Sequence, residues 1–127
     1  MFSDWQDRYE HLIELGKELP PIPPERKIPA NLVQGCQSQV WLDAELKDGR
    51  VRYTADSDAV ITKGIAALLV RVFSGHEPQE IIGASMDFID RIGLRAHLSP
   101  HRANGLSAMI DQMKRYALAL SSKTGKP

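Results

Sequence analysis

The apolar positions of the chain first recur at the spacing of a helix and then at that of a strand. Trp5, Tyr9 and Leu12 share one helical face, with acidic residues on the other, and Ser3 and Gln6 fit a capping box. This pattern predicts a first helix over about residues 4–18. Its aromatic residues are expected to pack in the core, and the prolines from Pro20 onward prevent the helix from continuing.

Apolar residues alternate with polar ones over residues 40–46 and again over residues 50–55. A period of two is typical of strands with one buried face. Asp48 and Gly49 lie between the two segments, and an Asp-Gly pair in this position is a strong hairpin signal. Because two strands alone are marginally stable, we expect a third strand near residues 31–34 and a covering helix.

The residues after the hairpin predict the principal core helix. Its wide apolar stripe runs from Ile61 to Phe73, Gly64 should allow close approach to the sheet, and Gly75 should stop the helix. Asp58, like the neighbouring Asp56 and Ser57, has a side-chain oxygen that can bind free amides at a helix start. We therefore expect Asp58 to cap this helix.

The C-terminal third of the chain predicts further helices. Pro78 suits the first turn of a short helix, Ser85 can cap another that ends before Gly93, and Ser99 with Pro100 begins the last one. The apolar face of this last helix consists of Leu106, Met109, Ile110, Met113 and Leu120. Residues 121–127 are polar and are expected to form a flexible tail.

Residues 19–29 contain five prolines among charged residues. Such a composition stiffens a chain without filling a core, so this segment predicts an ordered strap across the surface; a recognition motif for proline-binding modules is the alternative. Together these elements predict an α+β fold, in which a small curved antiparallel sheet of about three strands packs against several helices. The length of 127 residues fits a single domain, with its core at about residues 4–120.

Composition narrows the partners and the compartment. Sixteen basic residues balance sixteen acidic ones, so no overall field attracts nucleic acid or an anionic membrane. No apolar run approaches the ~20 residues that span a bilayer, and Asp4 and Asp7 are unlike the basic start of a signal peptide. A single cysteine fits a reducing, cytoplasmic location and cannot supply a cysteine cluster for metal binding. We expect no metal and no cofactor in this chain.

That single cysteine, Cys36, lies in a polar turn between Val33 and Val40. Gly35 permits backbone angles that would present the thiol at the tip of the turn, where chemistry is often displayed. Val33, Val40 and Trp41 could shelter it. A free cysteine is otherwise often an inert, buried residue, and the local sequence leaves these two interpretations about even.

The segment Gly35-Cys36-Gln37-Ser38-Gln39-Val40-Trp41 closely resembles the Gly-Cys-Gln-Ser-x-Val-Trp signature of the SufE family, and the resemblance extends over about residues 9–119. Ser57-Asp58-Ala59 followed by Lys63-Gly64 is similar to a second family motif. The segment from Leu98 to Leu106 is similar to a third, which contains Arg102. There the family commonly has a small hydroxyl residue where this chain has His101.

The resemblance implies a fold similar to that of SufE and IscU proteins and a role as a sulfur acceptor. Cys36 would take persulfide sulfur from a cysteine desulfurase of the SufS or CsdA kind, stimulate that enzyme and pass the sulfur to an iron–sulfur scaffold. Pyridoxal phosphate is implied for the partner alone. Asp58 and Arg102 carry over as supporting residues: Asp58 would help hold the cysteine turn, and Arg102 would reach toward that turn or toward the partner.

Other functions compete with the sulfur-acceptor interpretation. A CsdE-type carrier would feed another sulfur pathway through the same chemistry. An IscU-like scaffold needs several ligands around a cluster, and one cysteine leaves too few. An independent thiol enzyme needs a base beside Cys36, and no such pattern is evident. His97 and His101 could form a metal pair, but the pattern offers no carboxylate to complete it.

Overall fold

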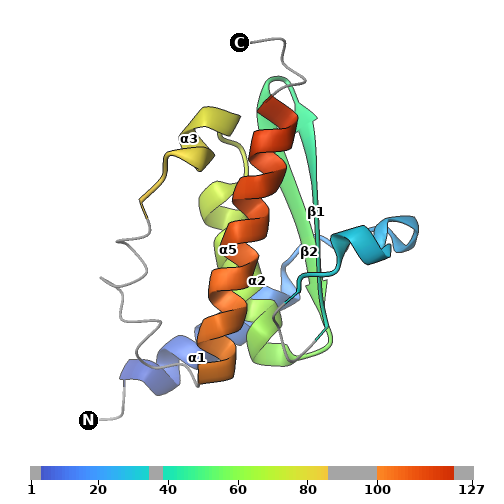
Figure 1. Cartoon of the computed structure of the whole chain (residues 1–127). Helices are drawn as coiled ribbons and strands as arrows, with labels where there is room; N and C mark the ends of the chain where they lie inside the picture. Colours follow the sequence, from blue (N-terminus) through green and yellow to red (C-terminus); the bar gives the residue numbers. More distant parts are fainter. Residues whose placement is uncertain (1–3, 35–38, 86–99, 122–127) are drawn as a thin grey trace.

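A computed structural model describes residues 4–34, 39–85 and 100–121, and it has the predicted α+β fold (Figure 1). It contains four helices and one two-stranded antiparallel sheet in this part of the chain. In chain order the elements are α1 (Asp4–Lys17), the 3₁₀ turns η1 (Pro24–Arg26) and η2 (Pro29–Asn31), β1 (Val40–Lys47), β2 (Arg50–Ser57), α2 (Val60–Phe73), α3 (Pro78–Ile82) and α5 (Pro100–Ser121).

The hairpin forms where the alternation and the Asp-Gly pair predict it. Its register runs from Val40 opposite Ser57 to Lys47 opposite Arg50. Asp48 and Gly49 have φ angles of 55° and 77°, and two positive values in succession give the turn whose twist matches that of the paired strands. The inner face is buried and apolar, and it consists of Val40, Leu42, Val51, Tyr53 and Ala55.

The predicted third strand is wrong for the described residues, in which the sheet has two strands. Leu32 forms only an isolated bridge with Trp41, and the N–H of Val33 donates to the carbonyl of Val40 at 2.8 Å. The reason is the 3₁₀ turn η2 (Pro29–Asn31), which leaves too little extended chain beside β1 before residue 35. The incoming chain therefore touches the end of β1 and does not run along it.

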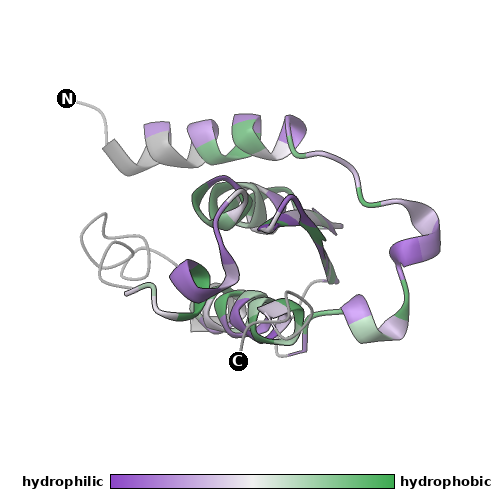
Figure 2. Cartoon of the chain, turned by 90° about the horizontal axis from the view of Figure 1, so that it is seen from above, coloured by the Kyte–Doolittle hydropathy of each residue, from purple (hydrophilic) through white to green (hydrophobic). Residues whose placement is uncertain are grey.

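Helices α2 and α5 cover the inner face of the hairpin, and α1 packs on the outer side of α2 (Figures 1 and 2). Gly64 was expected to approach the sheet, but it lies against α1: a Cβ atom there would overlap the carbonyl oxygen of Leu12. A Cβ atom on Gly16 would lie 3.1 Å from the backbone nitrogen of Gly64. The two helices thus cross with their backbones in near contact.

The predicted apolar face of α5 is confirmed. Leu106, Met109, Ile110 and Met113 are buried, and Leu120 is partly buried against the same core. The hydroxyl of Tyr53, on the inner face of β2, donates to the carbonyl of Met113 at 2.7 Å. Burial raises the pKa of Tyr53, so this hydroxyl stays protonated and can donate.

Residues 19–29 form the predicted ordered strap, from which Leu19 and Ile22 are buried. In Figure 2 the strap leaves the end of α1 and passes round the hairpin to the side where α5 lies. Arg26 binds the carboxylate of Asp43 through two hydrogen bonds of 2.8 and 2.9 Å. Because Asp43 is on the outer face of β1, this contact fixes the strap to the sheet.

The remaining predictions concern the C-terminal part. The short helix at Pro78 is α3, and Glu77 and Glu80 form a capping box at its start. The helix expected after Ser85, the cap at Ser99 and residues 122–127 lie outside the described residues, whereas Ser121, expected in the tail, is the last residue of α5. Within the described residues, no helix is long and apolar enough to cross a membrane.

Candidate functional site

The turn that carries Cys36 is described at both of its ends. Val33 and Val40 are buried, and the 2.8 Å hydrogen bond between them closes the chain on either side of residues 34–39. Trp41, the third residue expected to shelter the turn, is partly buried. Cys36 lies outside the described residues, so the exposure of its thiol stays a prediction.

Asp58 does not cap α2, and that prediction is wrong. The N-cap residue is Ala59, and no side chain accepts a capping hydrogen bond at this helix start. Asp58 instead binds Gln39: its Oδ1 accepts the N–H of Gln39 at 3.2 Å, and its own N–H donates to the carbonyl of Gln39 at 3.3 Å. Gln39 is the first described residue after the cysteine segment. Asp58 therefore holds the outgoing end of the turn.

The difference has a physical cause. A capping side chain belongs to the N-cap residue, from which it reaches the amides of the first helical turn, and Asp58 precedes that position by one residue. Its paired backbone contact with Gln39 directs it toward the cysteine turn. Ser57 lies nearer to the expected role, since its hydroxyl oxygen accepts the N–H of Ala59 at 3.2 Å.

Asp56 binds three groups from three segments, and apart from its place before Asp58 no sequence pattern indicates this. Its carboxylate lies 2.8 Å from Nζ of Lys27 in the strap and 3.5 Å from Nζ of Lys63 in α2, and it accepts the N–H of Ser57 at 2.8 Å. Partial burial pushes the pKa of Asp56 upward, but the hydrogen bonds from Lys27 and Ser57 and the charges of both lysines outweigh it. The net effect is a lowered pKa and a stable carboxylate.

Tyr116 joins α5 to the chain that leads into the turn. Its hydroxyl lies within hydrogen-bonding distance of Oδ1 of Asn31 and 3.0 Å from the carbonyl of Leu42, and it accepts a hydrogen bond from Gln112 at 3.1 Å. Asn31 is buried and also donates to the carbonyl of Arg26 at 2.7 Å. Sequence reasoning missed this cluster, because Asn31 and Tyr116 are 85 positions apart and no local pattern connects them.

The third predicted site residue, Arg102, is the third residue of α5, in its first turn as expected. Its side chain, that of His101 and the whole of His97 lie outside the described residues, so neither the role of Arg102 nor the histidine pair is tested. His11 and His76 are exposed. The described residues contain no group of three or more metal-ligating side chains close enough to hold an ion.

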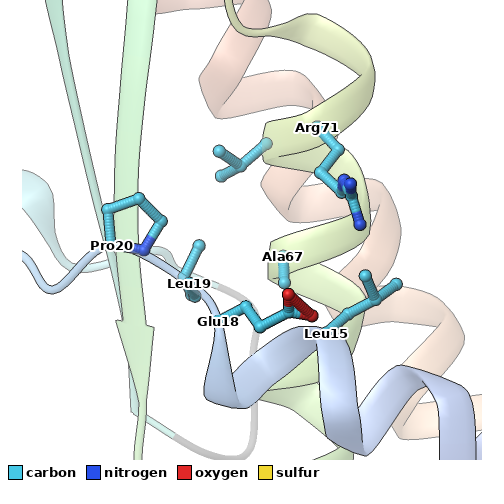
Figure 3. Close-up of a pocket in the computed structure, with 7 residues that line it drawn as sticks. Leu15, Glu18, Leu19, Pro20, Ala67 and Arg71 are labelled. Atoms are coloured by element: carbon cyan, nitrogen blue, oxygen red, sulfur yellow. The ribbon is translucent and has the colours of Figure 1, made fainter.

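A hollow of about 210 Å³ lies where the end of α1 meets α2 (Figure 3). Its wall is mostly apolar, with Glu18 and Arg71 as its charged residues. The other residues that line it are Leu15, Leu19, Pro20, Ala67 and Val70. Asp58 is not among them, so this hollow is separate from the contacts at the end of the cysteine turn.

The chain matches a class of proteins associated with iron–sulfur metabolism. Residues 1–117 match the family model described as SufE, Fe-S metabolism associated domain. The chain belongs to the SufE family, and the resemblance inferred from its motifs is confirmed.

Individual relatives agree with this assignment. An uncharacterised SufE-like protein of Synechocystis is 46% identical over 117 residues, which cover 92% of this chain and 74% of the relative. A SufE-like protein of Rhizobium meliloti is 42% identical and covers 88% of this chain and 84% of its own length. The chain is also 46% identical to SufE-like protein 1, chloroplastic/mitochondrial, of Arabidopsis thaliana over 91% of its length, but spans only 32% of that longer protein.

A solved structure has the same fold. The solution structure of a hypothetical protein from Thermus thermophilus superposes with a TM-score of 0.74 at 27% sequence identity. The match covers 93% of this chain and 88% of the other. The arrangement of the helices around the hairpin is therefore shared with a solved protein.

Proposed function

We propose that this chain accepts persulfide sulfur on Cys36 from a pyridoxal-phosphate cysteine desulfurase, and passes it on for iron–sulfur cluster assembly. The observation that carries the proposal is the membership of the SufE family, which is associated with iron–sulfur metabolism, together with the placement of the only cysteine in a turn closed by Val33 and Val40. Proteins of this family are generally acceptors of sulfur. The chain would then be a carrier and an activator, without turnover of its own.

The transfer step needs only the two thiols. The thiolate of Cys36 attacks the outer sulfur of the desulfurase persulfide, the bond between the two sulfurs of the donor breaks, and the donor cysteine leaves as a thiolate. Cys36 now carries the persulfide, and no external oxidant or reductant is consumed. Both attack and departure depend on thiolate character, as in thiol–disulfide exchange. Relieving the donor of its sulfur would free it for another turnover, so an acceptor also stimulates its partner.

Asp58 and Arg102 have supporting roles in this proposal. The two hydrogen bonds between Asp58 and Gln39 support a role for Asp58 in holding the turn. Arg102 lies in the first turn of α5, where the helix macrodipole disfavours a cation. A guanidinium there would be better used to bind loop carbonyls or to favour a thiolate or persulfide on Cys36.

The proposal is tested by mixing the protein with a cysteine desulfurase and free cysteine and then weighing the intact chain. The parent should gain one sulfur or more and should accelerate the desulfurase. Cys36→Ser should gain none and should not accelerate it, because this variant has no thiol, while its fold stays that of the parent. Equal acceleration by the parent and by Cys36→Ser would exclude the acceptor function. Running SufS-like and CsdA-like desulfurases in parallel identifies the partner and separates a CsdE-type carrier.

Asp58 and Arg102 are tested by substitutions with effects of opposite sign. Asp58→Ala should loosen the turn and raise the alkylation rate of Cys36. Asp58→Asn, whose side-chain oxygen can still accept the N–H of Gln39, is its matched control. Arg102→Ala should lower sulfur acceptance, with Arg115→Ala on the exposed side of the same helix as control. Parent-like behaviour of both alanine variants would assign the two residues ordinary surface roles.

A further inference from the structure

We propose that Asp56 is a positioning residue for the turn that carries Cys36, because its side chain binds both the strap before that turn and helix α2, and its backbone pairs with the strand that follows the turn. The proposal rests on the proposed function for the importance of the thiol. It rests on the geometry of Asp56 for the role itself. The family motif contains Ser57 and Asp58, which follow Asp56, and it assigns no role to Asp56 itself.

At the incoming end of the turn, Asp56 acts through the strap. Lys27 of the strap binds Oδ2 of Asp56 at 2.8 Å. Between Lys27 and Val33 the chain is held by consecutive short turns, in which the N–H of Asn31 donates to Ile28 and that of Leu32 donates to Pro29. Because this stretch is short and internally bonded, fixing Lys27 also fixes Leu32 and Val33.

At the outgoing end of the turn, Asp56 acts through the pairing of β2 with β1. Asp56 pairs in register with Trp41, which follows Val40 in β1 and forms the bridge with Leu32. The residue beside Asp56, Ser57, pairs with Val40 itself. The carboxylate of Asp56 accepts the N–H of Ser57 and so fixes the direction of the strand end. One side chain thus contacts the strap before the turn and the end of β2, and β2 pairs with β1, the strand that follows the turn.

The charge of Asp56 is shared by two lysines. One carboxylate faces two ammonium groups, Lys27 at 2.8 Å and Lys63 at 3.5 Å, with 26% of the Asp56 side chain exposed. Removal of the carboxylate leaves two cations without their shared anion and releases the strap from α2. Asp43 provides a matched comparison, since it binds Arg26 of the same strap with its side chain 15% exposed. Asp43 pairs with Thr54, further along the hairpin from the cysteine turn.

The experiment measures alkylation of Cys36 by iodoacetamide in the full chain, at a pH where the rate no longer rises with pH. Asp56→Asn should raise this plateau rate about three- to fivefold, the factor that a well-formed ion pair contributes. Asp56→Glu should restore most of the parent rate, and Asp43→Asn should raise the rate less than Asp56→Asn does, because Asp43 holds the strap but does not contact the end of β2 beside the turn. High salt should raise the parent toward Asp56→Asn and should move that variant less, since iodoacetamide is neutral and the ion pairs are screened.

The outcomes separate positioning from general loosening. A rise in Asp56→Asn that is matched by Asp43→Asn, or that Asp56→Glu fails to reverse, would overturn the proposal. Lys27→Met should reproduce Asp56→Asn, whereas Lys63→Met should have a smaller effect because its contact is longer. If the parent takes up no sulfur from any desulfurase, the proposed function fails, while the alkylation rates still decide the role of Asp56.

Discussion

Two contacts hold the outer parts of this molecule in different ways, and neither is a pairing of strands. On one side α1 packs on α2 through Gly16 and Gly64, with backbone against backbone. On the other side the strap crosses the hairpin and is held by two ion pairs, Arg26 with Asp43 and Lys27 with Asp56. The first contact depends on close packing of the two helix backbones alone. The second is made of charges that remain partly in water.

The difference fits what each contact supports. Close packing tolerates almost no added volume, so the α1–α2 contact is either correct or lost. Partly exposed ion pairs contribute little individually and respond to salt and pH. The adjustable contact is the one that leads into the cysteine turn, and the inflexible one lies at the other side of α2. Under the proposed function the turn delivers a thiol to a partner, and contacts of modest strength suit such a movement.

The largest effect is expected from Gly64→Ala. A Cβ atom at this position overlaps the carbonyl oxygen of Leu12, and overpacking of this kind costs about 3 kcal/mol. The better helix propensity of alanine offsets about 1 kcal/mol of that cost. The free energy of unfolding, measured with urea, should therefore fall by about 2 kcal/mol.

Gly83→Ala is the control for this prediction. Gly83 has a negative φ of −87°, and a Cβ atom there would make only an ordinary contact of 3.4 Å with the carbonyl of Gln79. Its unfolding free energy should stay close to that of the parent. If Gly64→Ala were equally harmless, the helices could move apart at little cost, and the contrast between the two contacts would disappear.

A smaller effect is expected from Tyr116→Phe, which acts on the segment that joins the strap to the cysteine turn. The hydroxyl that it removes serves Asn31 and the carbonyl of Leu42, so stability should fall by about 1 to 1.5 kcal/mol. Because Asn31 lies just before the cysteine turn, the alkylation rate of Cys36 should rise as well. Both quantities are measured on the same samples.

Tyr53→Phe sharpens this second prediction. It also removes a buried hydroxyl that donates to a carbonyl, that of Met113, but it lies under the inner face of the hairpin. We expect a comparable loss of stability with no change in Cys36 alkylation. A rise in alkylation for both variants would mean that the turn follows overall stability and has no particular link to the strap.

The parts of this fold that the sequence predicts are those set by neighbouring residues. The hairpin follows from alternation and from Asp48-Gly49, and α1, α2 and α3 follow from helical periodicity and prolines. The third strand failed because a 3₁₀ turn at Pro29 uses the residues that would have extended it. The α+β class did not depend on it, since the apolar faces of the strands, α2 and α5 were assigned correctly among the described residues.

The site was predictable in its motifs but not in its contacts. Asp58 was selected correctly as a neighbour of the cysteine turn, yet its expected helix cap is replaced by hydrogen bonds to Gln39. The Asp58 carboxylate could bind an amide at the start of α2 or the amide of Gln39, and which of them it binds depends on where the fold places each amide. The same holds for Lys27 with Asp56, which are 29 positions apart. No local pattern marks such a pair, because either residue alone is an ordinary surface charge.

The smallest effect concerns the pH dependence of the strap. The hydrogen bonds from Arg26 lower the pKa of Asp43 and outweigh the opposing effect of partial burial. A carboxyl whose pKa is lower in the folded chain contributes stability above its ordinary pKa of about 4, and this contribution is lost as the pH falls through the folded value. The difference in unfolding free energy between the parent and Asp43→Asn should thus be constant near neutral pH and should shrink in acid. Asp56→Asn should behave alike, since its pKa is also lowered. Urea unfolding of the three proteins over a pH series measures both differences, and a difference for Asp43→Asn that stays constant into acid would show that its pair with Arg26 contributes nothing. On the expected result the two aspartates agree in their pH dependence and differ in the alkylation of Cys36, because both hold the strap but only Asp56 also contacts the end of β2 beside the turn.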